Sequence, residues 1–149
     1  ASGKIISAFD IARALALGAD WCNSARGFMF AVGCIQSQSC HTDRCPTGVA
    51  TQDKSRQRAL VVPDKAARVA NYHGATMKSL AELVAAAGLS HPSQIMPYHL
   101  KKRVAADRVL RFDELYPPLA PGELISGTDD PRFRDAWRIA SAASFGGVR

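Results

Sequence analysis

The stretch ASGKIISAFDIARALALGADWCNSARG (residues 1–27) decides the fold class. A small polar loop comes first, and apolar residues then recur at the spacing of an amphipathic helix over residues 7–17. Ser7 and Asp10 have the spacing of a capping box, in which each side chain accepts a hydrogen bond from the other residue's backbone N–H. Gly18 follows as a typical helix stop. We therefore expect a capped helix over residues 7–17.

A buried strand is expected directly after this helix. Residues 19–23 form a short apolar segment between small polar residues, which suits a strand better than a helix. Residues 24–27 then read as a second small-residue loop. Loop, helix, strand and loop in this order are typical of an α/β fold with a parallel sheet.

Helix and loop dominate the rest of the predicted structure. Residues 61–89 carry an apolar stripe at helical spacing, with Pro63 in the first turn, and predict the longest helix. From Tyr116 onward the chain is rich in Pro, Gly and turn residues, so we expect an extended tail. One helix over residues 132–143 is predicted within this tail.

Composition narrows the classes of function. With 47% hydrophobic residues among 149, the chain can bury a core and is not compositionally disordered. Its net charge of +6 is spread along the chain without a run of five basic residues, which indicates a solvated surface suited to an acidic partner and not a nucleic-acid groove. No apolar run approaches a membrane span and no secretion signal is evident, so we expect a cytoplasmic, reducing setting.

Three of the four cysteines, Cys34, Cys40 and Cys45, lie within twelve positions on a polar segment that predicts a loop. A structural disulfide would need an oxidising compartment and would leave one of these thiols unpaired unless Cys22 joined. Zinc, with His41 as the fourth ligand, is disfavoured because structural zinc sites use pairs of ligands two to four residues apart.

An iron–sulfur cluster fits this spacing better. A cluster is several ångströms across, and a wrapping loop can supply its thiolate ligands from more widely spaced positions. Cys45 is followed by Pro46, an ending also found in ferredoxin ligand runs. Free buried cysteines are common in proteins, so the spacing alone leaves a cluster and unrelated thiols both open.

The string from Gly33 to Asp53, GCIQSQSCHTDRCPTGVATQD, resembles the iron–sulfur segment of glutamate synthase and the glutamate synthase-like FMN proteins. In that family a Gly-Cys start, the same cysteine spacing, Cys-Pro-x-Gly and Ala-Thr-Gln-Asp recur together. The family also places a glycine loop, a helix ending in Leu-Gly-Ala-acidic and a short strand before this segment, as residues 2–25 do here. The resemblance is strongest over residues 1–58.

This resemblance implies the C-terminal end of a TIM-type (β/α)8 barrel, mostly helix and loop in this chain. Residues 1–4 would follow the seventh strand, residues 7–17 would be the seventh helix, and residues 19–23 would be the eighth strand. A whole barrel needs roughly 200 residues or more, so the resemblance implies one piece of a longer enzyme. We expect residues 1–103 to be the end of the synthase domain and residues 104–149 to be a partly extended tail.

The resemblance also implies a site for the FMN phosphate, because loops after strands seven and eight of such barrels build phosphate sites from backbone N–H groups and a helix N-terminus. The residues that would hold it are Ser2, Gly3, Lys4, Ser24, Ala25, Arg26 and Gly27. The family usually has a second glycine where Lys4 stands and a threonine where Arg26 stands.

Cys34, Cys40 and Cys45 would, by the same resemblance, bind a 3Fe-4S cluster that passes electrons to FMN. The implied reaction reduces 2-iminoglutarate, formed from 2-oxoglutarate and ammonia or glutamine-derived nitrogen, to glutamate. The electron donor would be ferredoxin or a pyridine-nucleotide-dependent subunit, and no catalytic residue is assigned. The alternative is a small non-catalytic iron–sulfur or metal-binding module, or an inactive fragment.

Overall fold

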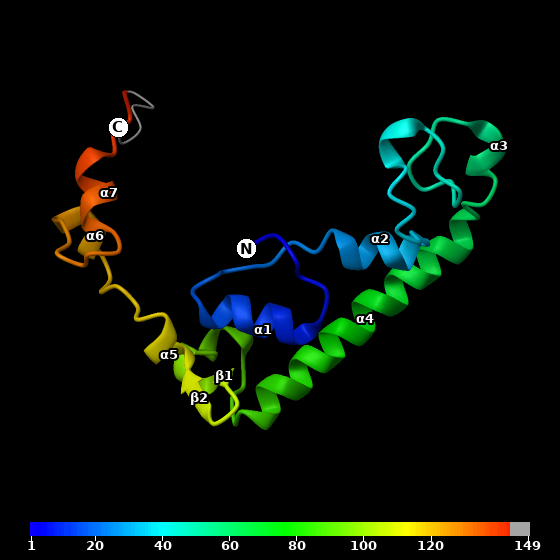
Figure 1. The fold of residues 1–149 in the computed structure, drawn as a ribbon. Coiled ribbons are helices and arrows are strands. Elements are labelled where there is room, and N and C mark those ends of the chain that lie inside the picture. Colours follow the sequence, from blue (N-terminus) through cyan, green and yellow to red (C-terminus); the bar gives the residue numbers. More distant parts are fainter. Residues whose placement is uncertain (144–149) are drawn as a thin grey trace. The chain divides into compact units, whose positions relative to one another are not determined.

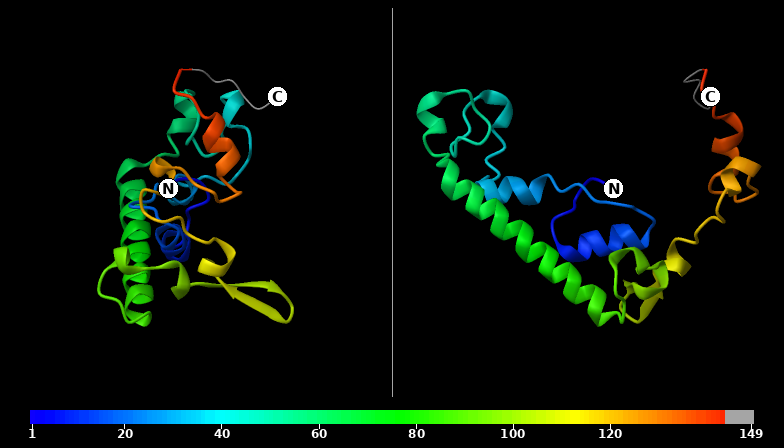
Figure 2. Two further views of the ribbon diagram at one scale, coloured as in Figure 1. Left: turned by 90° about the vertical axis from the view of Figure 1, so that its left-hand side faces the viewer. Right: turned by 180° about the vertical axis from the view of Figure 1, so that it is seen from behind.

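The computed structural model describes residues 1–143 and divides the chain into two units, Ala1–Leu115 and Tyr116–Arg149 (Figure 1). The first unit is built on one long helix, α4 (Val62–Ala86). Helices α1 (Ala8–Ala16) and α2 (Arg26–Val32) both lie along one side of α4 (Figure 2). The described residues are thus mostly helix and loop, as predicted.

Local signals in the sequence correctly place α1 and α4. At the start of α1, the Ser7 hydroxyl oxygen accepts a hydrogen bond from the Asp10 N–H at 3.3 Å, and the Asp10 carboxylate accepts one from the Ser7 N–H at 3.0 Å. This is the predicted capping box. Helix α4 carries Pro63 in its first turn and is followed by Gly88 in the left-handed region at φ 73°.

The predicted strand over residues 19–23 does not form as a strand. Within residues 1–143 this segment makes a single parallel bridge, between Ser2 and Asn23, and the Asn23 N–H donates to the Ala1 carbonyl at 2.8 Å. A strand forms when a neighbouring strand hydrogen-bonds along its length. Within the described residues, the neighbour of residues 19–23 is the short segment before α1, which is too short to complete a strand pair. One isolated bridge does not make the predicted parallel sheet; among the described residues, the sheet that forms is two-stranded and antiparallel.

The loop predicted over residues 24–27 is shorter than expected, because Arg26 and Gly27 already belong to α2. The small residues at 24–27 are typical of a loop when only the local sequence is considered. Helix α2 nevertheless begins at Arg26, because the residues that follow pack on α4. The Phe28 ring meets the Tyr72 ring of α4 edge-on, with centroids 5.1 Å apart. Gly33 ends α2 in the left-handed region at φ 119°.

The segment that carries the three clustered cysteines is a loop, as predicted. It contains only the short helices η1 (Cys40–Thr42) and α3 (Lys54–Gln57). It lies at the N-terminal end of α4, between α2 and α4 in the sequence (Figure 1).

The other end of α4 leads into an antiparallel hairpin that was not predicted. Short helices η2 (Pro92–Gln94) and η3 (Pro97–His99) come first, and β1 (Lys101–Ala105) then pairs with β2 (Arg108–Arg111) before α5 (Phe112–Leu115). Nearly all hairpin residues are exposed. A strand pair without a buried face lacks the alternation of apolar and polar residues by which strands are recognised.

The second unit, described as far as residue 143, contains α6 (Glu123–Ser126) and α7 (Arg134–Ile139). Helix α7 confirms the helix expected in the tail, although it is shorter than the predicted range of 132–143. Helix α6 was not predicted.

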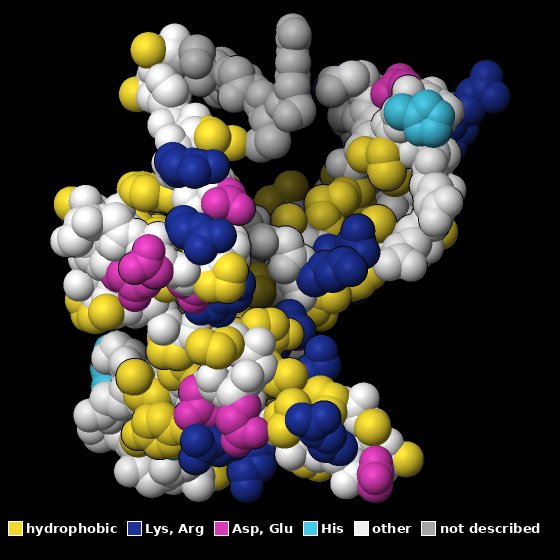
Figure 3. Space-filling view, turned by 60° about the vertical axis from the view of Figure 1, so that its left-hand side comes forward, with side chains coloured by type: hydrophobic (Ala, Val, Ile, Leu, Met, Phe, Trp, Pro, Cys, Tyr) yellow, Lys and Arg dark blue, Asp and Glu magenta, His cyan; other side chains and the backbone are white. Residues whose placement is uncertain are grey.

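Large hydrophobic side chains reach the surface in both units, and Figure 3 shows some of them in yellow. Trp21 is 72% exposed, Val62 is 73% exposed and Ile125 is 90% exposed. Within the described residues, no helix combines the length and the apolar character that a membrane crossing needs.

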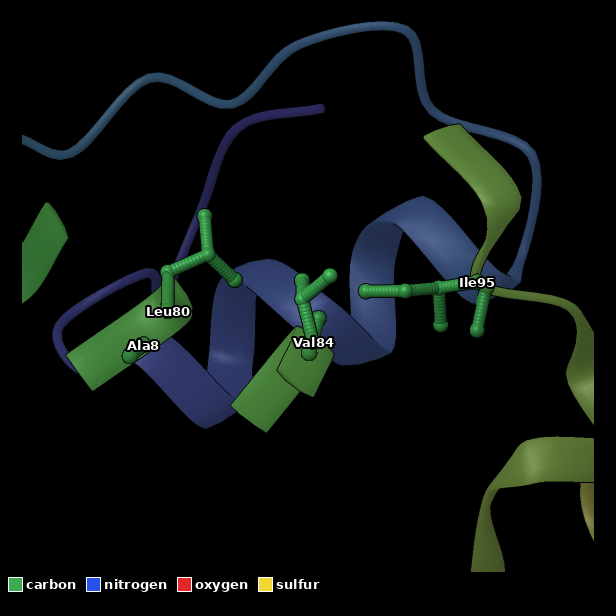
Figure 4. Close-up of a cluster of buried hydrophobic side chains, with 6 residues drawn as sticks. Ala8, Leu80, Val84 and Ile95 are labelled. Atoms are coloured by element: carbon green, nitrogen blue, oxygen red, sulfur yellow. The ribbon is translucent and has the colours of Figure 1, made fainter. Parts of the chain in front are cut away.

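The core of the first unit lies where α1 crosses α4. Small side chains of α1 recur every four residues and let the two helices approach closely. Leu80, Val84 and Ile95 lie along α1 (Figure 4). The buried cluster consists of Ala8, Ala12, Ala16, Leu80, Val84 and Ile95.

Candidate cofactor site

The fold brings the two predicted phosphate-binding loops side by side. The bridge between Ser2 and Asn23 places residues 1–4 directly beside the start of residues 24–27. Ser2, Gly3 and Lys4 are exposed residues. The loop backbone turns through the left-handed region at Gly3, with φ 96°, and at Lys4, with φ 55°.

The second loop differs from the first because part of it is buried. Ala25 and Arg26 are exposed at the start of α2, whereas Ser24 is half-buried and Gly27 is buried. The Ser24 hydroxyl donates a hydrogen bond of 2.6 Å to the Ile5 carbonyl. A hydroxyl has one proton, so this bond leaves the Ser24 side chain without a donor for a phosphate oxygen.

The three clustered cysteines lie on one loop but are not gathered at one point. Cys34 is half-buried, Cys40 is exposed and Cys45 is buried. Among residues 1–143, no three His, Cys, Asp or Glu side chains lie close enough together to hold a metal ion.

The surroundings of Cys45 favour its deprotonated form. The Thr47 hydroxyl lies 3.5 Å from the Cys45 sulfur. Hydrogen bonds from this hydroxyl and from backbone N–H groups of Ala50, Thr47 and Val49 lower the pKa of the Cys45 thiol to about 7. Thiolate is the form of cysteine that binds iron, so the chemistry of the donors fits an iron–sulfur cluster, although the loop would have to bring the three thiolates together.

Residues after Cys45 hold the cysteine loop in shape. The buried Thr51 hydroxyl donates to the Asp43 carbonyl at 2.6 Å, and the Asp43 carboxylate accepts from the Gln52 N–H at 2.6 Å. Gln57 of α3 donates to the Thr51 carbonyl at 2.7 Å. Sequence analysis did not assign Asp43 or Thr51 a role, although the Ala-Thr-Gln-Asp string that contains Thr51 was a signal that this stretch matters.

A cavity of about 390 Å³ separates this loop from α4. Cys34, Pro46 and Thr47 line it on the loop side, and Lys65 and Arg68 line it on the α4 side. Lys65 and Arg68 place positive charge on the α4 side of this cavity, and Lys65 is paired with the Asp64 carboxylate at 3.3 Å.

Residues 1–90 match the family described as a conserved region in glutamate synthase. This chain belongs to the glutamate synthase family. Two relatives come from Bacillus subtilis: YerD, which is a glutamate synthase large subunit-like protein, and the large chain of glutamate synthase [NADPH]. A third is ferredoxin-dependent glutamate synthase 2 from Synechocystis. No solved structure matches the chain.

These relatives are much longer than this chain. YerD is 46% identical over 115 residues, which cover 77% of this chain and 22% of YerD. The large chain is 33% identical over 87 residues, covering 58% of this chain and 6% of the relative. The Synechocystis protein is 41% identical over 64 residues, covering 42% of this chain and 4% of the relative. The chain thus spans less than a quarter of each.

The glutamate synthase match includes residues 1–4 and 24–27, the cysteine loop and all of α4. The hairpin of β1 and β2 and the whole second unit lie beyond it. All site residues predicted from the sequence therefore lie within the matched part of the chain.

Proposed function

We propose that residues 1–103 are the end of the FMN-binding domain of a glutamate synthase-like oxidoreductase. In this proposal, residues 1–4 follow the seventh strand of a TIM-type barrel, α1 is the seventh helix and residues 19–23 are the eighth strand. The observation that carries the proposal is the parallel pairing of Ser2 with Asn23, because adjacent barrel strands run in parallel. The family match over residues 1–90 supports it.

The two loops would hold the phosphate of FMN. Backbone N–H groups of both loops are the donors that phosphate sites at the top of such barrels use. The exposed side chains of Lys4 and Arg26 add positive charge on either side. The proposed phosphate-binding residues are Ser2, Gly3, Lys4, Ser24, Ala25, Arg26 and Gly27.

Cys34, Cys40 and Cys45 would hold the 3Fe-4S cluster as thiolates. Hydrogen bonds from Thr47 and from nearby backbone N–H groups already stabilise negative charge on the Cys45 sulfur. Such hydrogen bonds and the burial of the ligands are the features by which a protein sets the reduction potential of a cluster.

The proposed reaction is the reduction of 2-iminoglutarate, formed from 2-oxoglutarate and ammonia or glutamine-derived nitrogen, to glutamate. Bound FMN and the 3Fe-4S cluster would supply the electrons for this reduction. Relatives are named for NADPH or for ferredoxin, so the donor to this protein is ferredoxin or a pyridine-nucleotide-dependent subunit. Free cysteines, as all four are here, suit a reducing, cytoplasmic setting.

Anaerobic reconstitution with iron and sulfide tests the cluster. We expect broad brown visible absorbance that Cys40→Ser abolishes, because the thiolate of residue 40 would be a ligand. Cys22→Ser is the matched control and should retain the colour, because Cys22 lies outside the cysteine loop. Stoichiometric zinc binding without cluster assembly would instead favour the alternative of a small metal-binding module.

A further inference from the structure

Tyr72 of α4 contacts residues that adjoin both proposed phosphate-binding loops. Its hydroxyl donates a short hydrogen bond to the Ile6 carbonyl, two residues after the first loop. Its ring packs edge-on against Phe28, which follows the second loop directly. The side chain is half-buried. One residue of α4 therefore contacts the chain on both sides of the site.

Ser24, in the second loop, makes a similar hydrogen bond. Its hydroxyl donates to the Ile5 carbonyl at 2.6 Å, next to the carbonyl that Tyr72 binds. Two hydroxyl groups, from different elements, thus hold two consecutive carbonyl groups of the segment that joins the first loop to α1.

Gly27 shows how closely Tyr72 fits against the second loop. A Cβ atom at Gly27 would lie 2.0 Å from the Tyr72 hydroxyl oxygen and 3.0 Å from the Ser24 hydroxyl oxygen. Only a residue without a side chain leaves room for both hydroxyl groups. The absence of a side chain at residue 27 is therefore a requirement of this packing.

We propose that Tyr72, together with Ser24, is a positioning residue for the FMN phosphate, an inference that rests on the proposed function. The two hydroxyl groups fix the first loop against the second, so that backbone N–H groups from both loops meet one phosphate. The Ser24 side chain contributes through this contact and not as a donor to the phosphate, because its hydroxyl proton is already used, and only the Ser24 backbone N–H is left to face the phosphate. Small displacements of such a preorganised site weaken binding.

The test compares FMN with riboflavin, which lacks the phosphate, in the full-length protein. Tyr72→Phe removes the hydroxyl and keeps the ring. We expect the dissociation constant for FMN to rise about three- to tenfold, the effect of losing one hydrogen bond, while that for riboflavin stays unchanged. Ser24→Ala should act in the same direction and serves as the second variant if Tyr72→Phe does not fold.

Thr76→Val is the matched control. The Thr76 hydroxyl also donates to a backbone carbonyl, that of Tyr72 at 2.8 Å, but this bond stays within α4. It should leave the ratio of the FMN and riboflavin dissociation constants unchanged.

Each other outcome has a distinct meaning. Equal weakening of FMN and riboflavin binding, or no change with either variant, would overturn the positioning role, because it would show a general structural effect or none. If the unmodified protein binds riboflavin as tightly as FMN, or binds neither, the phosphate site itself is refuted and the positioning role with it.

Discussion

At the scale of single residues, some features of the site can be predicted from local sequence patterns, whereas others depend on contacts between residues far apart in the sequence. Spacing alone leaves the role of Cys34, Cys40 and Cys45 open, and the family resemblance, a local pattern, is what implies that they are ligands. The bond between Tyr72 and Ile6 joins residues 66 positions apart, and no local pattern indicates it. The same holds for the bond from Thr51 to Asp43, which depends on how the loop closes.

Lys4 allows a direct test of strain in the first loop. Its φ of 55° lies in the left-handed region, which costs a residue with a Cβ about 1–2 kcal/mol and costs glycine nothing. We predict that Lys4→Gly raises the free energy of unfolding by about 1 kcal/mol, part of the gain being lost to the greater flexibility of glycine in the unfolded chain. Denaturant unfolding measures this difference.

Lys4→Ala provides the control for charge, because alanine removes the ammonium but keeps the Cβ. It should bring no gain in stability. If alanine stabilises the protein as much as glycine does, removal of charge and not relief of the backbone is the cause.

At the scale of elements, the predictions succeeded where a helix is specified by its own residues. Helix α1 has its capping box and α4 has Pro63, and both signals lie within one turn of the helix. The strand over residues 19–23 depends on neighbouring strands, and the hairpin of β1 and β2 has almost no buried face. Helix α2 is specified by packing on α4, so its first residues resembled a loop.

The capping box of α1 predicts a dependence of stability on pH. The Ser7 N–H donates to the Asp10 carboxylate and is the largest cause that lowers the Asp10 pKa below its usual 3.8. A lowered pKa in the folded state means that the stabilisation is fully present above the unfolded pKa of about 3.9. It is lost as the pH falls through the lower, folded pKa.

Asp10→Asn should remove the decrease in stability that protonation of Asp10 causes in acid. The measurement is the melting temperature at neutral pH compared with that below pH 4. Ser7→Ala should lower stability by about 1 kcal/mol at neutral pH. An acid dependence that persists in Asp10→Asn would show that the cap does not contribute to it.

At the scale of the whole molecule, the family match and the cysteines lie in the first unit, Ala1–Leu115. Trp21, which stands on the proposed eighth strand, is 72% exposed. In the proposed barrel, neighbouring strands and helices would cover such a residue. The hydrophobic surface of the first unit is therefore consistent with a place inside a larger enzyme.

Truncation after Leu115 tests whether the second unit is needed. We predict that residues 1–115 assemble the cluster as the full chain does, because all four cysteines and the contacts that shape the cysteine loop lie within them. Visible absorbance per chain after reconstitution measures assembly. Loss of the cluster on truncation, with the melting temperature unchanged, would show that the second unit contributes to the site.

The iron and sulfide content of the reconstituted protein, together with its EPR spectrum, tests most directly whether three thiolates of one loop hold a three-iron cluster. We predict about three irons and four sulfides per chain, the ratio of a 3Fe-4S cluster, with the EPR signal of an oxidised three-iron cluster. Cys34→Ser, Cys40→Ser and Cys45→Ser should each abolish the signal, and Cys22→Ser should retain it. A stable cluster with two or four irons, or a signal that survives loss of Cys45, would contradict the claim.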